Sequence, residues 1–151
     1  MKAIIQRVSH ASVTVDGETK GKIDKGYMIL LGVTNEDTCA QAELLASKTA
    51  NLRIFCDEND KMNLSLLDIG GAALVISNFT LCADTKKGNR PSFINAMPPT
   101  EADRLYNYYC DCLKTSGVGV VEKGVFGADM KVELLNDGPV TITLDTDIWR
   151  K

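Results

Sequence analysis

Alternating apolar and polar positions, broken by turn-forming residues, predict short strands over the first third of the chain. Lys2–Val8 and Ser12–Val15 have strand spacing, and Asp16-Gly17 then predicts a tight hairpin whose returning strand is Glu18–Ile23. Tyr27–Val33 is apolar almost throughout, which is typical of a strand buried on both faces. The chain is therefore expected to begin as a sheet.

A first helix is predicted from its amino-terminal signals. Thr38 and Gln41 have the spacing of a capping box, and Asp37 places negative charge near the positive end of the helix dipole. Helical spacing then continues to about Ala50. The buried stripe of this helix is expected at Ala42, Leu45, Ala46 and Thr49.

A second helix is predicted after Pro98-Pro99, with Thr100 as its cap and an end near Gly117. Tyr106, Tyr108 and Tyr109 are interpreted as packing and surface residues rather than as a platform for stacking bases. The buried stripe is expected at Ala102, Leu105, Tyr109 and Cys112.

The other apolar runs predict further strands, and Asn63–Asp68 is ambiguous. Asn136–Pro139 is a turn signal between the last two of these strands. The element order lacks the regular strand–helix alternation of a doubly wound sheet. We therefore expect a single α+β domain over residues 1–151, with mostly antiparallel β-sheets and two helices packed on one side in β/β/α layers. The further strands are Leu52–Cys56, Ala72–Ile76, Val118–Glu122, Met130–Leu135 and Val140–Asp145.

Composition and charge narrow the class of protein. The 151 residues are 44% hydrophobic and 25% charged, as in ordinary globular proteins, and no apolar run is long enough to span a bilayer. The chain does not open on a signal-peptide pattern, so a cytoplasmic location is expected. A formal net charge of −3 argues against a general nucleic-acid binder. This net charge is compatible with a local basic patch that binds one phosphate-rich end of a nucleic acid.

The sequence offers little of the usual catalytic equipment. The five cysteines have no metal-ligand spacing and are interpreted as reduced, mostly buried thiols. The single histidine, His10, has no visible partner for a Ser-His-Asp or Cys-His arrangement, and no phosphate-binding glycine motif is present. No metal and no cofactor are expected, so an enzyme built this way would rely on positioning and backbone hydrogen bonds.

The stretch from Ala72 to Phe93 carries the strongest candidate site. An apolar run gives way to Ser77, Asn78 and Thr80, and then to a segment that carries three cations. The polar residues suit equally a strand end or a binding site, and the charges of the segment are also typical of a solvated loop. The three cations are Lys86, Lys87 and Arg90.

Two motifs within this chain resemble those of the D-aminoacyl-tRNA deacylases of bacteria and eukaryotes. Ser77–Leu81 reads SNFTL, which is similar to the SQFTL motif of that family, and Asn136–Thr141 reads NDGPVT, which is similar to its NxGPVT motif. The resemblance runs nearly end to end and includes the opening KAIIQRVSHASVTVDG and the segment NLRIFCDENDKMNLSLLDIGG. It departs at Asn78, where the family has glutamine, so the role of this position is open.

The resemblance implies a homodimer that hydrolyses the ester between a D-amino acid, or glycine, and the terminal adenosine of tRNA. It implies that Gly138-Pro139 is cis and reaches the pocket of the partner subunit, where its carbonyls exclude L-side chains. Arg7 matches the arginine that holds this dipeptide, and Met130 lies beside the site. Related proofreading deacylases with another mischarged tRNA, and a non-catalytic module that binds the tRNA end, are the alternative functions.

The resemblance also divides the roles within the candidate site. Backbone N–H groups near Phe79 and Thr80 would hold the developing oxyanion. Thr80 has been proposed in the family as a nucleophile, but no base is evident that would activate it. We therefore expect Ser77 and Thr80 to position groups while the substrate's 2′-hydroxyl helps to activate water. The phosphates of the tRNA end are expected to meet Lys86, Lys87 and Arg90.

Overall fold

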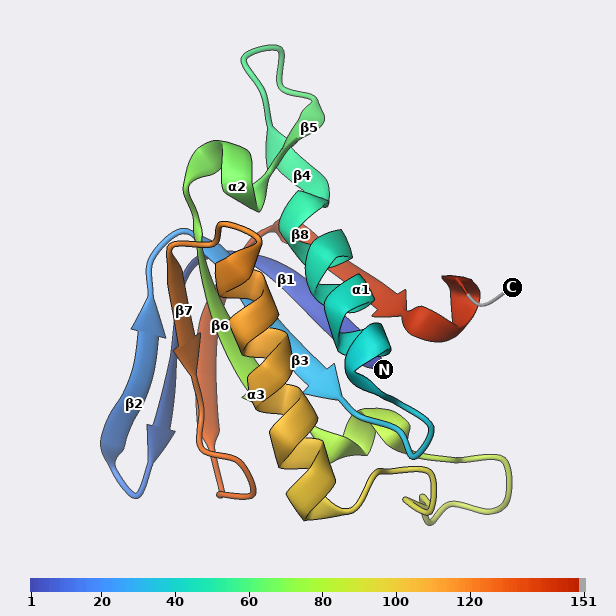
Figure 1. Ribbon diagram of the computed structural model, residues 1–151. Coiled ribbons are helices and arrows are strands. Elements are labelled where there is room, and N and C mark those ends of the chain that lie inside the picture. The colour runs from blue at the N-terminus through green and yellow to red at the C-terminus, as the bar shows by residue number, and fades with distance from the viewer. Residues whose placement is uncertain (150–151) are drawn as a thin grey trace.

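The computed structural model describes residues 1–149, which form an α+β fold around a strongly curved six-stranded sheet (Figure 1). Five strands follow the order β2-β1-β3-β6-β7, and β8 pairs with β1 along nearly its whole length. β1 is antiparallel to its three neighbours, whereas β3, β6 and β7 run parallel to one another. These strands are β1 (Lys2–Val15), β2 (Glu18–Ile23), β3 (Gly26–Gly32), β6 (Ala72–Ser77), β7 (Val120–Lys123) and β8 (Lys131–Asp145).

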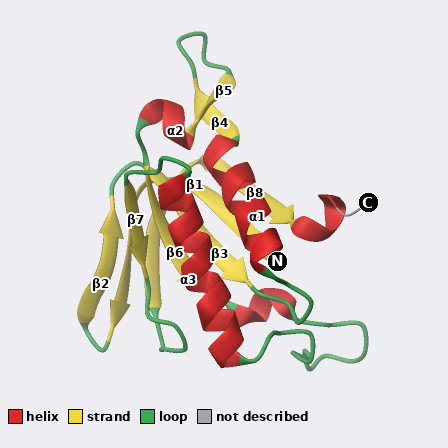
Figure 2. Ribbon diagram, viewed as in Figure 1, coloured by secondary structure: helices red, strands yellow, loops and turns green. Residues whose placement is uncertain are grey.

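Two long helices, α1 (Cys39–Asn51) and α3 (Pro99–Thr115), lie side by side over one face of the sheet (Figure 2). The predicted α+β class, with mostly antiparallel pairing and two helices on one side, is confirmed. Smaller elements connect this framework, and the hairpin of β4 and β5 projects beyond it. They are β4 (Arg53–Cys56), β5 (Met62–Ser65), α2 (Leu66–Ile69) and the 3₁₀ helices η1 (Phe79–Cys82) and η2 (Thr146–Trp149).

The curvature of the sheet creates two apolar cores. The larger lies between the sheet and the helices, where Tyr27, Leu45 and Tyr109 are fully buried. The smaller lies inside the curve, where Val13, Met28 and Leu74 come together from three strands. Burial on both faces explains why β3 and β6 read as continuous apolar runs.

The predicted capping box at Thr38 and Gln41 is present, and α1 starts at the next residue, Cys39. The cap predicted for the second helix is wrong. That helix begins at Pro99, its N-cap is Pro98, which makes no side-chain capping bond, and Thr100 lies inside the first turn. A proline at the first helical position has its φ preset for a helix, so a polar cap is not required there.

Two strand boundaries also differ from the prediction. Lys2–Val8 and Ser12–Val15 are parts of one strand, β1, and the two final segments form one strand, β8, that includes the residues of the predicted turn. The pairing register of β1 with β8 shifts between Gln6 and His10. The two strands are paired both before and after this irregularity. The ambiguous segment Asn63–Asp68 spans the end of β5 and most of α2.

Candidate active site

The candidate site lies where the parallel strands β3 and β6 end at the same edge of the sheet. The Asn78 amide still donates to the Leu31 carbonyl at 2.8 Å, and the chain then leaves the sheet as η1. Gly32 permits this turn, because a Cβ there would lie 2.8 Å from Leu81 Cβ. The polar residues after the apolar run are thus placed at a strand end and also at the mouth of a cavity.

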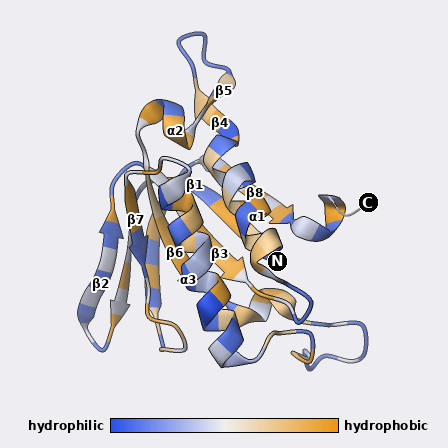
Figure 3. Ribbon diagram, in the orientation of Figure 1, coloured by the Kyte–Doolittle hydropathy of each residue, from blue (hydrophilic) through white to orange (hydrophobic). Residues whose placement is uncertain are grey.

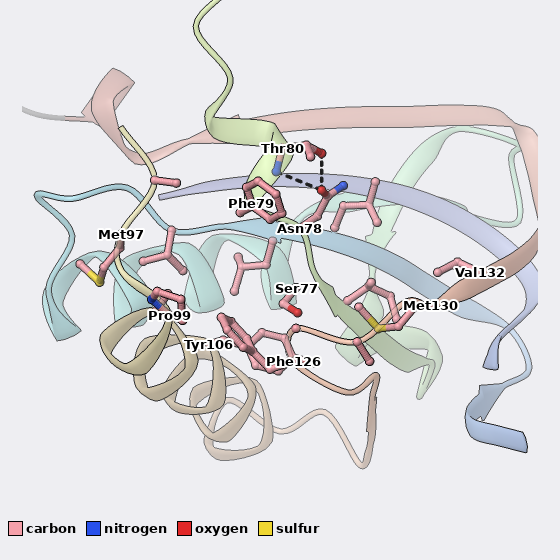
Figure 4. Close-up of a pocket in the computed structure, with 18 of the residues that line it drawn as sticks. Ser77, Asn78, Phe79, Thr80, Met97, Pro99, Tyr106, Phe126, Met130 and Val132 are labelled. Carbon is pink, nitrogen blue, oxygen red and sulfur yellow. Dashed lines mark hydrogen bonds between the residues drawn. The ribbon is translucent and has the colours of Figure 1, made fainter. Parts of the chain in front are cut away.

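This cavity has a volume of about 910 Å³ and lies between the end of β6, the start of α3 and the segment that leads into β8 (Figure 4). Its walls are mostly apolar, with a small polar group at one side, as is usual for sites that bind small organic groups. Of the sequence-predicted site residues, the cavity brings together Ser77, Asn78, Phe79, Thr80 and Met130. Gly138, Pro139, Arg7, Lys86, Lys87 and Arg90 do not line it.

Asn78 and Thr80 form the polar group at the cavity wall. Asn78 Oδ1 accepts a hydrogen bond from the Thr80 amide at 3.2 Å, which caps η1, and a second one from the Thr80 hydroxyl (Figure 4). Both donors of Thr80 are therefore directed at a neutral amide oxygen. An amide oxygen is a poor proton acceptor, so this contact orients the hydroxyl and does not activate it as a nucleophile.

The Phe79 amide offers a different kind of donor. It donates to no acceptor within residues 1–149, and it opens a 3₁₀ helix, where the first amides have no partner inside the helix. A free backbone N–H at the wall of a mostly apolar cavity can stabilise negative charge on an oxygen. Of the two amides expected to act in this way, that of Phe79 is free and that of Thr80 is engaged by Asn78.

Ionisable groups are scarce around the cavity. Asp129 is the one carboxylate in its lining within the described chain, and its side chain is 85% exposed and 3.3 Å from the Lys131 ammonium. Burial raises the pKa of the Tyr106 phenol above its ordinary value, and its hydroxyl donates to the Val75 carbonyl at 2.6 Å. Tyr106 is therefore neutral and already bonded. Among residues 1–149, no group of His, Cys, Asp and Glu could hold a metal ion.

The three predicted cations lie on a loop that projects beside the cavity, and Figure 3 shows the hydrophilic colour of its projecting part. Asp84 and Ser92 close the base of this loop with two backbone hydrogen bonds of 2.8 and 2.9 Å. We call residues 84–92 the basic loop. Its cations, Lys86, Lys87 and Arg90, are all exposed.

The segment that follows the basic loop is anchored to the body of the protein. The Asn35 amide donates to the Asn95 carbonyl and the Met97 amide donates to the Val33 carbonyl, both at 3.0 Å. The segment around residue 35 is fixed in turn by Asp37, whose carboxylate accepts from the buried Met1 ammonium at 2.6 Å. The segment that follows the basic loop is thus fixed where it lines the cavity, at Ala96 and Met97.

Gly138-Pro139 lies outside the cavity of its own chain. Its peptide bond is cis, and both residues are exposed. Asn136 braces the segment, because its side chain accepts from the Val140 amide at 2.8 Å and donates to the Val140 carbonyl at 3.1 Å. The dipeptide is therefore a braced, exposed backbone feature that does not line the cavity.

Arg7 connects this segment with the β4 strand. Its Nε donates to the Asp137 carbonyl at 2.8 Å, and its Nη1 donates to the Ile54 carbonyl at 2.7 Å. The residue is 9% exposed, so the guanidinium is held in a largely dry setting where hydrogen bonds are stronger than in water. Arg7 thus contacts the residue directly before the dipeptide.

Sequence reasoning missed much of the cavity wall. Tyr106 is predicted to be a packing residue, yet it both packs and lines the cavity, and Phe126 lies beside it in the same wall (Figure 4). The two rings are 6.0 Å apart between centroids. Periodicity identifies Tyr106 only as a residue on the buried side of its helix. Phe126 lies outside regular structure, where no periodic signal exists.

Comparisons with known proteins show the family of the chain. The family model described as D-Tyr-tRNA(Tyr) deacylase matches residues 4–145. A D-aminoacyl-tRNA deacylase of Ruegeria pomeroyi is 61% identical over 96% of this chain and 99% of its own length. One of Fusobacterium nucleatum is 56% identical over 97% and 96%. No helix within residues 1–149 is long and apolar enough to cross a membrane.

Solved structures extend the comparison to the fold. One described as c-Myc DNA unwinding element binding protein has a TM-score of 0.90 and 44% identity, over 96% of this chain and 98% of that one. A probable eukaryotic D-amino acid tRNA deacylase has a TM-score of 0.80 at 14% identity, over 95% and 97%, and supports the fold alone. By the family model and by relatives that match over nearly the whole chain, this protein belongs to the D-Tyr-tRNA(Tyr) deacylase family.

Proposed function

We propose that this protein hydrolyses the ester that joins a D-amino acid to the terminal adenosine of tRNA, and thereby releases the amino acid and free tRNA. The observation that carries the proposal is the free Phe79 amide at the wall of a mostly apolar cavity that contains almost no ionisable groups. An aminoacyl ester is intrinsically labile. A site that only orients it and stabilises its oxyanion is chemically sufficient.

The proposed reaction begins with the ester carbonyl oxygen directed at the Phe79 amide. Attack by water makes this oxygen negative, and the amide stabilises it at a position where bulk water is reduced. The adenosine 2′-hydroxyl, which neighbours the ester, helps to activate the water. Ser77 and Thr80 position the reacting groups, and Asn78 holds Thr80 in its observed rotamer. Collapse of the tetrahedral intermediate then breaks the bond to the ribose 3′-oxygen, which takes up the proton lost by the attacking water and leaves as the 3′-hydroxyl.

The active unit is proposed to be a homodimer in which Gly138-Pro139 of one subunit enters the cavity of the other. The support is that the dipeptide is exposed, braced by Asn136 and Arg7, and remote from the lining of its own cavity. Rigid backbone carbonyls at the mouth of the cavity would leave no room for an L-side chain. Chirality would then be judged by exclusion, and glycine, which has no side chain, would also be accepted.

The basic loop is proposed to contact the phosphates of the tRNA end. Its three exposed cations, Lys86, Lys87 and Arg90, project beside the cavity from a chain whose overall charge is −3. Such a local patch suits the end of one RNA chain and does not suit a long duplex. Since aminoacyl-tRNA is consumed by translation, the proposed compartment is the cytoplasm.

The test is to mix the purified protein with D-Tyr-tRNA, L-Tyr-tRNA and Gly-tRNA and to follow loss of each ester. Rapid loss of the D-ester and of the glycyl ester, with sparing of the L-ester, is expected. Selective loss of a different mischarged species would indicate a related proofreading deacylase. Binding of all three without hydrolysis would indicate a non-catalytic module that holds the tRNA end.

A further inference from the structure

The Phe79 side chain has no part in the chemistry proposed above, which uses only its backbone amide. Its ring is 59% exposed, although it lies at the wall of the cavity (Figure 4). Single exposed apolar residues are common and carry no meaning alone. This ring is distinguished by what holds it and by what lies on either side of it.

Phe93 fixes the orientation of the Phe79 ring. The two rings pack edge to face, with centroids 5.0 Å apart and an interplanar angle of 74°. Such a contact supports one aromatic ring through the edge or face of the other and leaves the remaining surface of Phe79 open. An exposed ring with a fixed plane loses little conformational entropy when a flat group is placed on it.

The same contact joins the cavity to the basic loop. Phe93 directly follows Ser92, whose two backbone bonds to Asp84 close the base of that loop. The order in space is therefore a cavity, an exposed aromatic ring, and a loop that carries the exposed cations Lys86, Lys87 and Arg90. An aromatic platform beside a basic track is the arrangement by which proteins bind single-stranded nucleic acid.

We propose that the Phe79 ring is a stacking platform for the nucleobase that directly precedes the terminal adenosine of the RNA. The inference rests on the proposed function, because a terminal nucleoside in the cavity requires the preceding nucleotide to leave past the cavity wall. The base stacks on Phe79, and its phosphates continue toward the basic loop. Stacking accepts any base, so the platform adds affinity without selecting a sequence.

The test compares two substrates that differ only by this nucleotide. One is D-tyrosyl-adenosine, and the other is a D-tyrosyl dinucleotide with cytidine before the adenosine. Phe79→Leu is expected to lower kcat/KM for the dinucleotide at least about fivefold more than for the nucleoside, since one stacked base contributes about 1–3 kcal/mol. Phe79→Tyr keeps the ring and should restore the wild-type ratio of the two values.

Phe126→Leu is the matched control, because it removes a ring from the opposite wall of the same cavity. It should lower kcat/KM for both substrates by a similar factor. A third substrate has an abasic ribose in place of the cytidine nucleoside. For the wild-type protein, loss of the base should lower kcat/KM by the same factor as Phe79→Leu does on the intact dinucleotide. For Phe79→Leu, loss of the base should cause no further decrease in kcat/KM.

Equal losses on the nucleoside and the dinucleotide in Phe79→Leu would overturn the proposal, because the ring would then act on the amino acid or be covered by the second subunit. The proposal would also be overturned if loss of the base lowered kcat/KM by the same factor in the wild-type protein and in Phe79→Leu. If the wild-type protein hydrolysed neither these substrates nor D-Tyr-tRNA itself, the proposed function would fail separately. Fluorescence anisotropy with the uncharged dinucleotide and its abasic counterpart would still decide whether Phe79 binds the base.

Discussion

Asn78 Oδ1 accepts hydrogen bonds from both the backbone amide and the side-chain hydroxyl of Thr80. One side chain therefore caps η1, fixes the Thr80 rotamer and occupies one of two neighbouring amides, while the Phe79 amide remains free. Asn78 is also the position at which the chain departs from the family motif. The shorter amide suits this role, because N-cap residues have short polar side chains that reach the backbone two or three positions on.

Replacement of Asn78 by alanine is expected to reduce the free energy of unfolding by about 1 kcal/mol, through loss of the cap. Thermal denaturation should then show a melting temperature lower by roughly 2–4 °C. Hydrolysis of D-Tyr-tRNA should also slow, because Thr80 is no longer held in its observed rotamer.

Asn78→Asp is the control that separates the loss of stability from the slower hydrolysis. Aspartate can accept both Thr80 hydrogen bonds, so the free energy of unfolding should stay near that of the wild type. Its negative charge lies beside the site of the developing oxyanion and should slow hydrolysis tenfold or more. A fully active Asn78→Asp variant would contradict the placement of the oxyanion at the Phe79 amide.

Removal of the Thr80 hydroxyl is expected to have a modest effect. Since the hydroxyl donates to an amide oxygen and faces no base, it can position groups but not attack the ester. Thr80→Ala should lower kcat/KM by about 2- to 10-fold, the value of one hydrogen bond. Mass spectrometry of rapidly quenched reactions should find no aminoacyl adduct on the wild-type protein. A trapped Thr80 ester, together with loss of turnover in Thr80→Ala at unchanged affinity, would contradict this mechanism.

Local signals in the sequence were sufficient for the elements that frame the site. The apolar runs of β3 and β6 and the capping box before α1 each depend on residues close together in the chain. The change from apolar to polar at Ser77 correctly marked the end of a strand, although periodicity alone could not tell a strand end from a binding site. In the structure, the end of this strand lies at the wall of the cavity.

The cavity wall could not be predicted, because it is made by residues far apart in the chain. Tyr106 and Phe126 meet only when α3 packs against the sheet and the segment after β7 crosses its end. The single strand β8 was missed for a related reason. Asn136–Pro139 has the composition of a turn, but pairing with β1 on both sides keeps the flanking segments in one strand.

A methyl group on Gly138 is expected to disturb the exposed dipeptide. A Cβ there would lie 2.7 Å from the Val140 amide nitrogen, and the φ of +151° is one that L-residues rarely adopt. Gly138→Ala should therefore reduce the preference for D-Tyr-tRNA over L-Tyr-tRNA, measured as a ratio of kcat/KM values.

Gly17→Ala is the matched control for this substitution. Gly17 also has a positive φ, of +79°, but its Cβ would meet no atom within 4 Å and it lies in the hairpin between β1 and β2. Gly17→Ala should lower the free energy of unfolding and leave the ratio of kcat/KM values for D-Tyr-tRNA and L-Tyr-tRNA unchanged. If Gly138→Ala retained wild-type discrimination, the assignment of chiral exclusion to this dipeptide would be wrong.

Replacement of Arg7 by lysine is expected to lower the free energy of unfolding by about 1.5–3 kcal/mol, through loss of one of two charged hydrogen bonds. One ammonium cannot reproduce the two directed bonds to the Asp137 and Ile54 carbonyls, and each such charged bond is worth about 1.5–3 kcal/mol. Urea denaturation measures this change. The D/L ratio should fall as well, since the residue before Gly138 loses its anchor. Arg104→Lys, at an exposed arginine paired with Glu101, should change stability by less than about 0.5 kcal/mol.

Reactivity of the thiols provides a check on the packing of the buried cysteines. Cys56 is exposed and its sulfur lies 3.9 Å from Arg7 Nη1, whereas Cys82 and Cys110 are buried. Burial raises the pKa of the Cys82 thiol, and it raises that of Cys110 to about 12. On the order of 10⁻⁴ of the Cys110 thiol is then ionised at pH 8.

In the native protein at pH 8, Ellman's reagent should react rapidly with one thiol, Cys56, and more slowly with the half-buried Cys39 and Cys112. Cys82 and Cys110 should react only after unfolding in urea, when all five thiols become accessible. Cys56→Ser should remove the rapid phase alone. Rapid reaction of Cys110 in the folded protein would contradict the packing of α3 against the sheet, because its sulfur can reach the reagent only if that helix moves away.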